Sequence, residues 1–212
     1  MVGAGVLLEC LEDSRVQSVL AIGRSPTGRT HPKLREILRA DFFNYDDLRS
    51  EFASCDACFF CLGVTSVGLD EAAYTHLTYD LTTAAARAMA AVNPNMTFCY
   101  VSGVGTDSTG RGRTMWARVK GKTENAILAL PFKAAFMFRP GFIQPVKGVR
   151  SKTAWYQAAY TVLGPIASVL LRLAPNQVTT TARLGRAMIR VAHGGFDTRI
   201  LHAREINALA GE

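Results

Sequence analysis

Residues 18–23 read Ser-Val-Leu-Ala-Ile-Gly, an apolar run of strand length that the turn residues Arg24-Ser25-Pro26 close. Four further segments of strand length follow along the chain, at Leu34–Asp41, Asp56–Gly63, Met96–Ser102 and Lys133–Arg139. Apolar runs of this length between turn signals are typical of strands that are buried on both faces. The chain therefore predicts a parallel sheet built from these segments.

Longer helical patterns separate the predicted strands. They cover residues Asp46–Ala53, Asp70–Val92, Thr114–Leu130 and Lys152–Ala174, and a helix at Thr181–Ala192, a short extended piece and a final helical turn complete the chain. Strands that alternate with helices indicate an α/β fold, a Rossmann-type doubly wound parallel sheet. With no repeat or linker in sight, we expect a single domain over residues 1–212, with 152–212 as its C-terminal, substrate-side portion.

The composition excludes several other classes of protein. A chain of 212 residues that is 49% hydrophobic and 19% charged can bury a core of its own, unlike a disordered chain, a collagen-like repeat or a disulfide-stapled miniprotein. The five cysteines are an odd number and lie mostly in apolar runs. Together with the absence of a basic start to Met1–Leu11, they predict reduced thiols and a cytoplasmic protein.

The net charge of +7 comes from one stretch of the chain. Between Thr109 and Lys152 there are ten basic residues and one acid, a balance of +9, whereas the remainder has 14 basic and 16 acidic residues, a balance of −2. No nucleic-acid-binding motif accompanies these charges, so we expect no nucleic-acid partner. A solvated basic face and a site for an anionic ligand both remain open.

The N-terminus begins directly with a helical pattern, Met1–Leu11. A doubly wound dinucleotide-binding fold normally opens with a strand and a glycine-rich turn before this helix, and Gly3 takes the place of the third glycine, which lets the helix pack closely. The fold therefore apparently lacks its first strand, the one at the centre of the sheet. We expect the chain as written to be marginally stable, or its true start to lie upstream.

Residues at the ends of the predicted strands suggest how a cofactor would bind. Arg24 follows the strand at 18–23, where a guanidinium would meet the 2′-phosphate of NADP, while an acid there would favour NAD. Asp41 could accept a hydrogen bond from the adenine amino group, or simply cap the turn before Tyr45. Gly63 would let the backbone approach a ligand. An ordinary surface role for Arg24 is the alternative.

Two other patterns resemble a membrane segment and a metal site. Ala154–Ala174 has one formal charge and approaches the ~20 residues that span a bilayer. Pro165 would kink a helix there. We therefore expect a helix on the surface of the domain, for example at a homodimer contact. Peripheral contact with a membrane stays open. Cys55, Cys58 and Cys61 have the spacing of a metal-ligand run, but Cys58–Cys61 lies in a strand pattern, where residues three apart point to opposite faces, and we expect no metal.

Seven segments carry a resemblance to a known family: MVGAGVLLECL, AIGRSP, CLGVTS, YVSGVGTD, WARVKGKTENAI, FRPGFIQP and TTARLGRAMIRVA. Over nearly its whole length the chain resembles an atypical short-chain dehydrogenase/reductase of the NAD(P)-dependent epimerase/dehydratase group, and is similar to small bacterial proteins of the Tat-interacting protein family. The resemblance implies a bound NADP(H), with NAD the less favoured cofactor. Its contacts would be Gly3, Arg24, Asp41, Cys61, Leu62, Gly63, Lys120 and Pro140.

The resemblance also implies a catalytic set, in which this chain departs from the family. That set comprises a serine after a strand, here Ser102, and a tyrosine four residues before a lysine, here Lys120. Trp116 occupies the tyrosine position, and an indole N–H can donate a hydrogen bond but cannot exchange a proton near neutral pH. Two hypotheses follow: an oxidoreductase or epimerase-like enzyme acting on an unknown small molecule, or a catalytically inactive dinucleotide-binding regulatory or scaffold protein.

Overall fold

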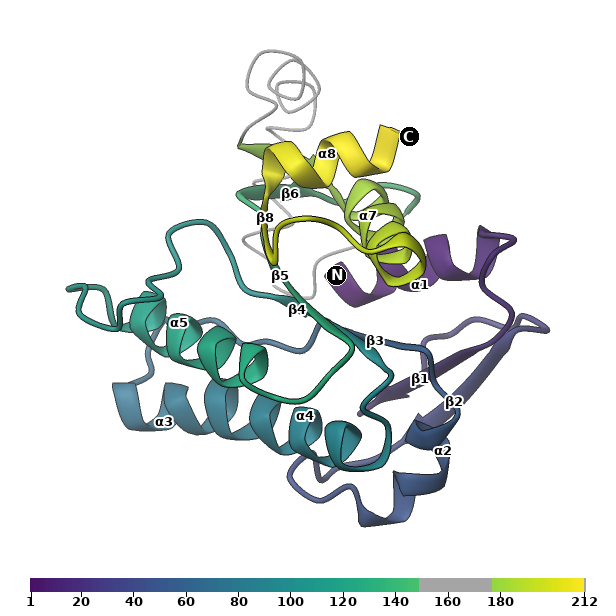
Figure 1. Ribbon diagram of the computed structural model, residues 1–212, viewed down its shortest axis with the longest axis horizontal. Coiled ribbons are helices and arrows are strands. Elements are labelled where there is room, and N and C mark those ends of the chain that lie inside the picture. Colours follow the sequence, from purple (N-terminus) through teal and green to yellow (C-terminus); the bar gives the residue numbers. More distant parts are fainter. Residues whose placement is uncertain (149–176, 212) are drawn as a thin grey trace. The chain divides into compact units, whose positions relative to one another are not determined.

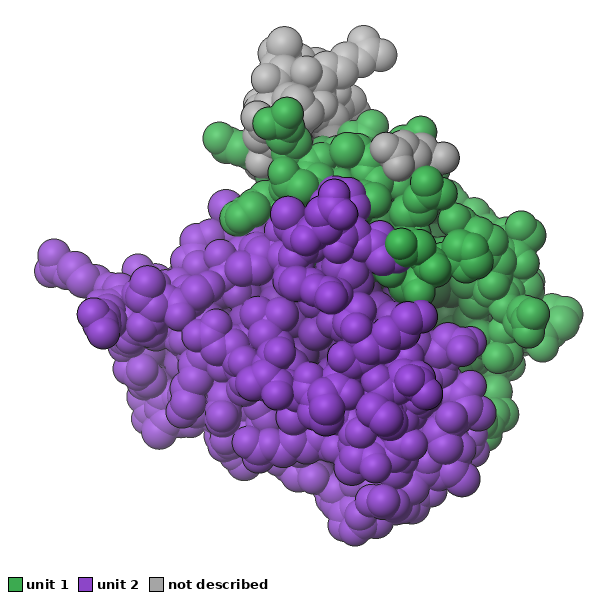
Figure 2. Space-filling view, in the orientation of Figure 1, with its two compact units in different colours: residues 1–40, 140–194, 201–212 green, residues 41–139, 195–200 purple. Residues whose placement is uncertain are grey.

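The computed structural model describes residues 1–148 and 177–211 (Figure 1). The chain divides into two compact units, each assembled from separate segments (Figure 2). Unit 1 comprises residues 1–40, 140–194 and 201–212, and unit 2 comprises residues 41–139 and 195–200. The helix predicted at Lys152–Ala174 and the apolar stretch Ala154–Ala174 lie outside the described residues. Among the described residues, no helix has the length and apolar character needed to cross a bilayer.

Unit 1 opens with helix α1 (Val2–Glu12), followed by strands β1 (Val19–Gly23) and β2 (Leu34–Leu38). The two strands pair in parallel, with Val19 opposite Leu34 and Gly23 opposite Leu38. The predicted starting helix and both predicted strands are confirmed, although β2 ends three residues before Asp41. All five residues of β1 are only half-buried, although the apolar run predicted a buried strand.

The rest of unit 1 contains three short strands and two helices: β6 (Phe142–Gln144), β7 (Val178–Thr180), α7 (Thr181–Gly194), β8 (Ile200–His202) and α8 (Ala203–Gly211). Strand β6 pairs in parallel with β7, and β8 begins in unit 2 at Ile200. Helix α7 packs against α1 and α8. The helix predicted at Thr181–Ala192, the extended piece after it and the final helical turn are therefore confirmed.

The close helix packing that we expected at Gly3 occurs at Gly5 instead. A Cβ atom on Gly5 would lie 2.3 Å from the Cβ of Thr181, at the start of α7, whereas Gly3 is exposed. Two positions along a helix correspond to about 200° of rotation, so Gly3 faces away from the side on which Gly5 packs. The contact also joins helix to helix rather than helix to sheet.

The sheet of unit 2 is built on strands β3 (Ala57–Phe60), β4 (Thr97–Val101) and β5 (Ala134–Arg139), with β8 next to β5. All three pair in parallel, with Phe60 opposite Tyr100 and Tyr100 opposite Met137. The first four residues of β4 and the middle four of β5 are buried, as expected for parallel strands with an unbroken apolar sequence.

Figure 1 shows the long helices of unit 2 on one face of these strands. They are α3 (Glu71–Thr75), the π-helical turn η2 (His76–Asp80), α4 (Leu81–Val92) and α5 (Met115–Leu128), while a 3₁₀ turn η1 (Asp46–Leu48) and α2 (Arg49–Ala53) come before β3. The helix predicted over Asp70–Val92 is present, widened by η2 at its middle. Asp70 caps it, accepting a hydrogen bond from the Ala73 N–H at 2.7 Å.

The predicted mixed α/β fold with parallel strands is confirmed. In the described residues the strands form a pair, β1–β2, a group in the order β3-β4-β5-β8, and a second pair, β6–β7. Strands β6 and β7 were not predicted, because three residues are too few to show a strand period.

Candidate functional site

The candidate site lies where β4 ends and α5 passes beside it, within unit 2. Ser102 directly follows β4, and Lys120 lies in the second turn of α5. The Lys120 Nζ donates a hydrogen bond to the backbone carbonyl of Ser102 at 2.6 Å. The structure thus brings together two of the three predicted catalytic residues. Burial lowers the pKa of Lys120 to about 8, against a smaller opposing effect of the Glu124 carboxylate.

The Ser102 hydroxyl is bonded in the interior and not to Lys120. It lies 2.5 Å from Glu124 Oε1, to which it donates, and 3.1 Å from the carbonyl oxygen of Phe138. Only 8% of the residue is exposed. Ser102 therefore contributes its carbonyl to Lys120, and its hydroxyl to the interior rather than to a ligand.

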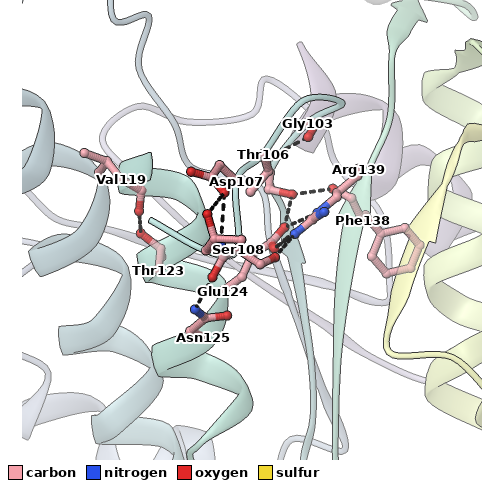
Figure 3. Close-up of polar contacts among 12 residues, drawn as sticks. Gly103, Thr106, Asp107, Ser108, Val119, Thr123, Glu124, Asn125, Phe138 and Arg139 are labelled. Atoms are coloured by element: carbon pink, nitrogen blue, oxygen red, sulfur yellow. Dashed lines mark hydrogen bonds and ion pairs between the residues drawn. The ribbon is translucent and has the colours of Figure 1, made fainter. Parts of the chain in front are cut away.

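Glu124 and Arg139 form a buried ion pair (Figure 3), and its carboxylate is the one that accepts from the Ser102 hydroxyl. The Glu124 side chain is fully buried, and that of Arg139, at the end of β5, is 11% exposed. Arg139 Nε lies 3.0 and 3.2 Å from the two carboxylate oxygens, while Nη2 donates to Glu124 Oε2 and to the Ser108 hydroxyl. Charge-assisted, forked contacts of this kind satisfy both groups and offset the cost of burying them.

The loop between β4 and α5 is fastened to the helix by further hydrogen bonds. The Asp107 N–H donates to the Ala117 carbonyl at 3.0 Å, and Asn125 Nδ2 donates to the Ser108 carbonyl at 2.9 Å. A Cβ atom on Gly121 would lie 1.8 Å from the Asp107 carbonyl oxygen, so only glycine permits this approach. Hydrogen bonds from Thr109 and from the backbone of the loop lower the pKa of the Asp107 carboxyl.

Trp116, the third predicted catalytic residue, lies one helical turn before Lys120, so the two share a face of α5. It is half-buried, and its ring stands 3.4 Å from where a Cβ atom would be on Gly105. Gly105 has a φ of +85°, a left-handed conformation that favours glycine. The indole thus packs against the loop that follows β4.

The predicted cofactor contacts in unit 2 lie at strand ends and in a turn. Cys61, Leu62 and Gly63 directly follow β3, and no atom lies within 4 Å of the place where a Cβ atom would be on Gly63. Leu62 is 38% exposed and Cys61 is half-buried. The Asp41 carboxylate accepts a hydrogen bond from the Phe43 N–H at 2.7 Å. This is the turn cap that we expected from the sequence as the alternative to an adenine contact.

The other predicted contacts belong to unit 1. Gly3 and Arg24 are exposed, in α1 and just after β1 respectively, and Pro140 is buried.

The cysteines of unit 2 bear on the question of a metal site. Burial raises the pKa of the Cys58 thiol well above its usual range, because the thiolate would be poorly solvated there. Within residues 1–148 and 177–211, no three His, Cys, Asp or Glu side chains gather into a group that could hold a metal ion.

Sequence reasoning missed the Glu124–Arg139 pair, which is the best-connected polar feature of the site. In the sequence, Glu124 belongs to the segment that carries Lys120 and Arg139 ends a predicted strand, and neither is a predicted site residue. Only Arg139 offered a signal, because it ends an apolar run, where an unpaired charge is costly to bury; Glu124 stands among polar residues in the sequence.

Several solved structures share this fold. The Bordetella bronchiseptica enzyme WbmH in complex with NAD+ has a TM-score of 0.60 and 15% identity, covering 91% of this chain and 68% of its own. A short-chain dehydrogenase from Burkholderia cenocepacia in complex with NADP gives 0.63 and 16%, over 98% and 86% of the two chains. UDP-glucuronic acid 4-epimerase from Bacillus cereus in complex with NAD gives 0.66 and 12%, over 100% and 81%.

No family model and no curated protein sequence matches this chain. The similarity at these low identities concerns the fold, which is that of Rossmann-type proteins solved with NAD or NADP.

Proposed function

We propose that this chain binds a nicotinamide dinucleotide at the carboxyl ends of its parallel strands and acts on a small molecule as an oxidoreductase or epimerase-like enzyme. The observation that carries the proposal is the Lys120 ammonium, held by the Ser102 carbonyl directly after β4. In open parallel sheets, ligands bind outside the carboxyl ends of the strands, which is the edge where this ammonium lies.

The residues at this edge fit such a cofactor. The backbone at Gly63 is open where a side chain would otherwise stand, which allows close approach of a ligand. One hydrogen bond to Ser102 leaves the Lys120 ammonium with two further N–H donors, which suit the ribose hydroxyls. A bound reduced dinucleotide would supply a hydride for the carbon atom of a substrate carbonyl.

The chain itself must then deliver a proton to the substrate oxygen. Trp116 cannot do so near neutral pH, because its N–H is not acidic. Lys120 Nζ, with a pKa of about 8, is in the range that suits a general acid at neutral pH. We therefore assign to Lys120 both the orientation of the ribose and a proton that it can give up at Nζ.

Direct binding measurements test this proposal. Titration of the protein with NADPH and NADH, followed by tryptophan fluorescence, should show saturable quenching. Lys120→Met should weaken binding roughly tenfold or more, since hydrogen bonds to a charged group contribute about 1.5–3 kcal/mol. The absence of binding at millimolar concentrations of both dinucleotides would rule out the proposal. Trp116→Phe, which leaves Trp155 in place, identifies the source of the quenching.

Preference for NADP is the finer part of the proposal and depends on Arg24. Its exposed guanidinium follows β1, as expected of a group that meets a 2′-phosphate. Arg24→Gln should weaken NADPH binding about 10- to 100-fold and leave NADH binding within about twofold, because only NADPH carries the phosphate. Equal losses for both dinucleotides would remove this role from Arg24.

The alternative is a protein that binds the dinucleotide without turnover, and Trp116 is the observation that favours it. A screen of small carbonyl compounds, monitored by NADPH consumption, separates the two functions, because any turnover by the wild-type protein removes the alternative. We also propose that the chain is similar to the Tat-interacting protein family, that it is located in the cytoplasm and that it forms a homodimer.

A further inference from the structure

The buried Glu124–Arg139 ion pair is hydrogen-bonded to two serines of the segment that follows β4, Ser102 and Ser108. Glu124 lies one helical turn after Lys120 on the same face of α5, and its carboxylate accepts from the hydroxyl of Ser102, the residue whose carbonyl receives the Lys120 ammonium. Arg139 links the same carboxylate to Ser108, farther along the loop. The pair is thus bonded to two residues of the segment that borders Lys120.

We propose that Glu124 and Arg139 are positioning residues for Lys120: the pair fixes the Ser102 carbonyl that receives its ammonium, and the Glu124 carboxylate lies one helical turn from that ammonium. Lys120 matters in this way because of the proposed function, on which the inference rests. The ion pair is buried, so we assign it an action through Lys120 and the loop and not through direct contact with a ligand.

The geometric half of the inference follows from what fixes the Ser102 carbonyl. The Ser102 N–H donates to the Phe138 carbonyl at 2.8 Å, and its hydroxyl is fastened to Glu124 at 2.5 Å. Phe138 directly precedes Arg139 at the end of β5. Ser102 is therefore bonded both to β5 and to α5. These two bonds fix the orientation of the carbonyl that accepts from Lys120.

The electrostatic half follows from the charges around Lys120. On the elements packed against α5, Glu71 of α3 pairs with Arg118 at 2.6 Å, the Tyr79 ring of η2 lies under Lys122, and the Asp107 carboxylate is bonded within its own loop. Glu124 is the charged neighbour that raises the pKa of Lys120, against the larger effect of burial. Its fully buried carboxylate acts with little screening by water.

Chemical labelling of the lysines tests this inference without any cofactor. An amine reacts with acetic anhydride in its neutral form, so the rate at which Lys120 is labelled at pH 7, read by mass spectrometry, reports how much of it is unprotonated. Glu124→Gln should raise this rate roughly fivefold, because loss of an opposite charge typically lowers an ammonium pKa by about one, which takes the neutral fraction at pH 7 from about a tenth to about a half. Lys122, labelled in the same sample, is the internal reference.

A second variant keeps the test valid if Glu124→Gln, which leaves Arg139 buried without its partner, does not fold. Glu124→Gln combined with Arg139→Met removes both charges, and such replacements of a buried ion pair are often tolerated. The Lys120 labelling rate of this double variant should lie between those of the wild type and of Glu124→Gln. Glu71→Gln, which breaks the partly exposed ion pair between α3 and Arg118 of α5, is the matched control and should leave the rate unchanged.

The outcomes separate this inference from the proposed function. If Lys120 is labelled at the wild-type rate in the folded Glu124 variants, the pair has only a structural role and the inference fails. If labelling changes as expected but no dinucleotide binds, the proposed function fails while the positioning of Lys120 stands. If both hold, the Glu124→Gln variant should also move the pH dependence of NADPH binding to lower pH.

Discussion

At the scale of single residues, Trp116 occupies the position one helical turn before Lys120, from which an acidic side chain could exchange a proton with a substrate. A phenol in its place would lie one helical turn from the Lys120 ammonium, whose positive charge favours the ionised phenol and lowers its pKa. Trp116→Tyr should therefore create or raise NADPH-dependent reduction of small carbonyl compounds. A general acid typically contributes about 10²–10⁴-fold in rate, which sets the size of the expected gain.

Trp116→Phe is the control for this variant, because it removes the indole and adds no acid. Both variants leave a smaller ring beside Gly105 and lose similar packing, so a difference in rate between them is due to the phenol. Equal rates in the two variants would show that position 116 does not reach the substrate.

Some of these residue positions could be predicted from the sequence, and others could not. That Ser102 and Lys120 lie together follows from a strand end and a helix that passes it. The direction of the Ser102 hydroxyl could not be predicted, because it is fixed by Glu124 and by the Phe138 carbonyl, which come from other elements. The pairing of Glu124 with Arg139 joins a helix to a strand and leaves no periodic signal.

At the scale of elements, the position of α5 depends on its contact with the loop at Asp107. Gly121→Ala would bring a methyl group against the Asp107 carbonyl, which is backbone and cannot turn aside. We expect a loss of about 1–3 kcal/mol or more in the free energy of unfolding, in spite of the gain of up to ~1 kcal/mol that alanine brings to a helix. Urea denaturation measures this change.

Gly194→Ala, at the end of α7, is the matched control. No atom lies within 4 Å of the place where its Cβ would be, so the free energy of unfolding should stay within about 0.5 kcal/mol of wild type. If the Gly121→Ala variant is as stable as this control, the loop at Asp107 can move away from the added methyl group without a loss in the free energy of unfolding. Such a result would also weaken the view that α5 and the loop act as one support for Lys120.

The elements themselves could be predicted because parallel strands covered on both faces need apolar residues at nearly every position. Strands β4 and β5 show this pattern, and their predicted bounds differ from the observed ones by one residue at most. The turn η2 could not be predicted, because one wide turn inside a long helix leaves the helical pattern of residues 70–92 almost unchanged.

At the scale of the whole molecule, the titration of Lys120 should make the free energy of unfolding depend on pH. The pKa of this amine is about 8 in the folded protein and 10.5 in its ordinary state, so between these values the unfolded chain binds more protons than the folded one. By linkage, Lys120 makes the fold more stable as pH rises from about 8 to 10.5. Cys10, whose pKa burial raises to about 12, acts in the opposite direction above its ordinary value of 9.0.

A comparison of the wild type with Lys120→Met isolates this effect, because Cys10 and the other titrating groups are common to both proteins and cancel. Below pH 8 the wild type must bury the charged ammonium of Lys120, which lowers its free energy of unfolding. Methionine carries no charge, so the variant has no such cost. The free energy of unfolding of the variant minus that of the wild type should therefore fall by about 2–4 kcal/mol between pH 7 and 10.5, at about 1.4 kcal/mol for each unit of pKa difference. Denaturation curves at several pH values provide this difference. A constant difference would mean that Lys120 titrates in the folded protein as it does in water, and that its ammonium is not held in a buried site after β4.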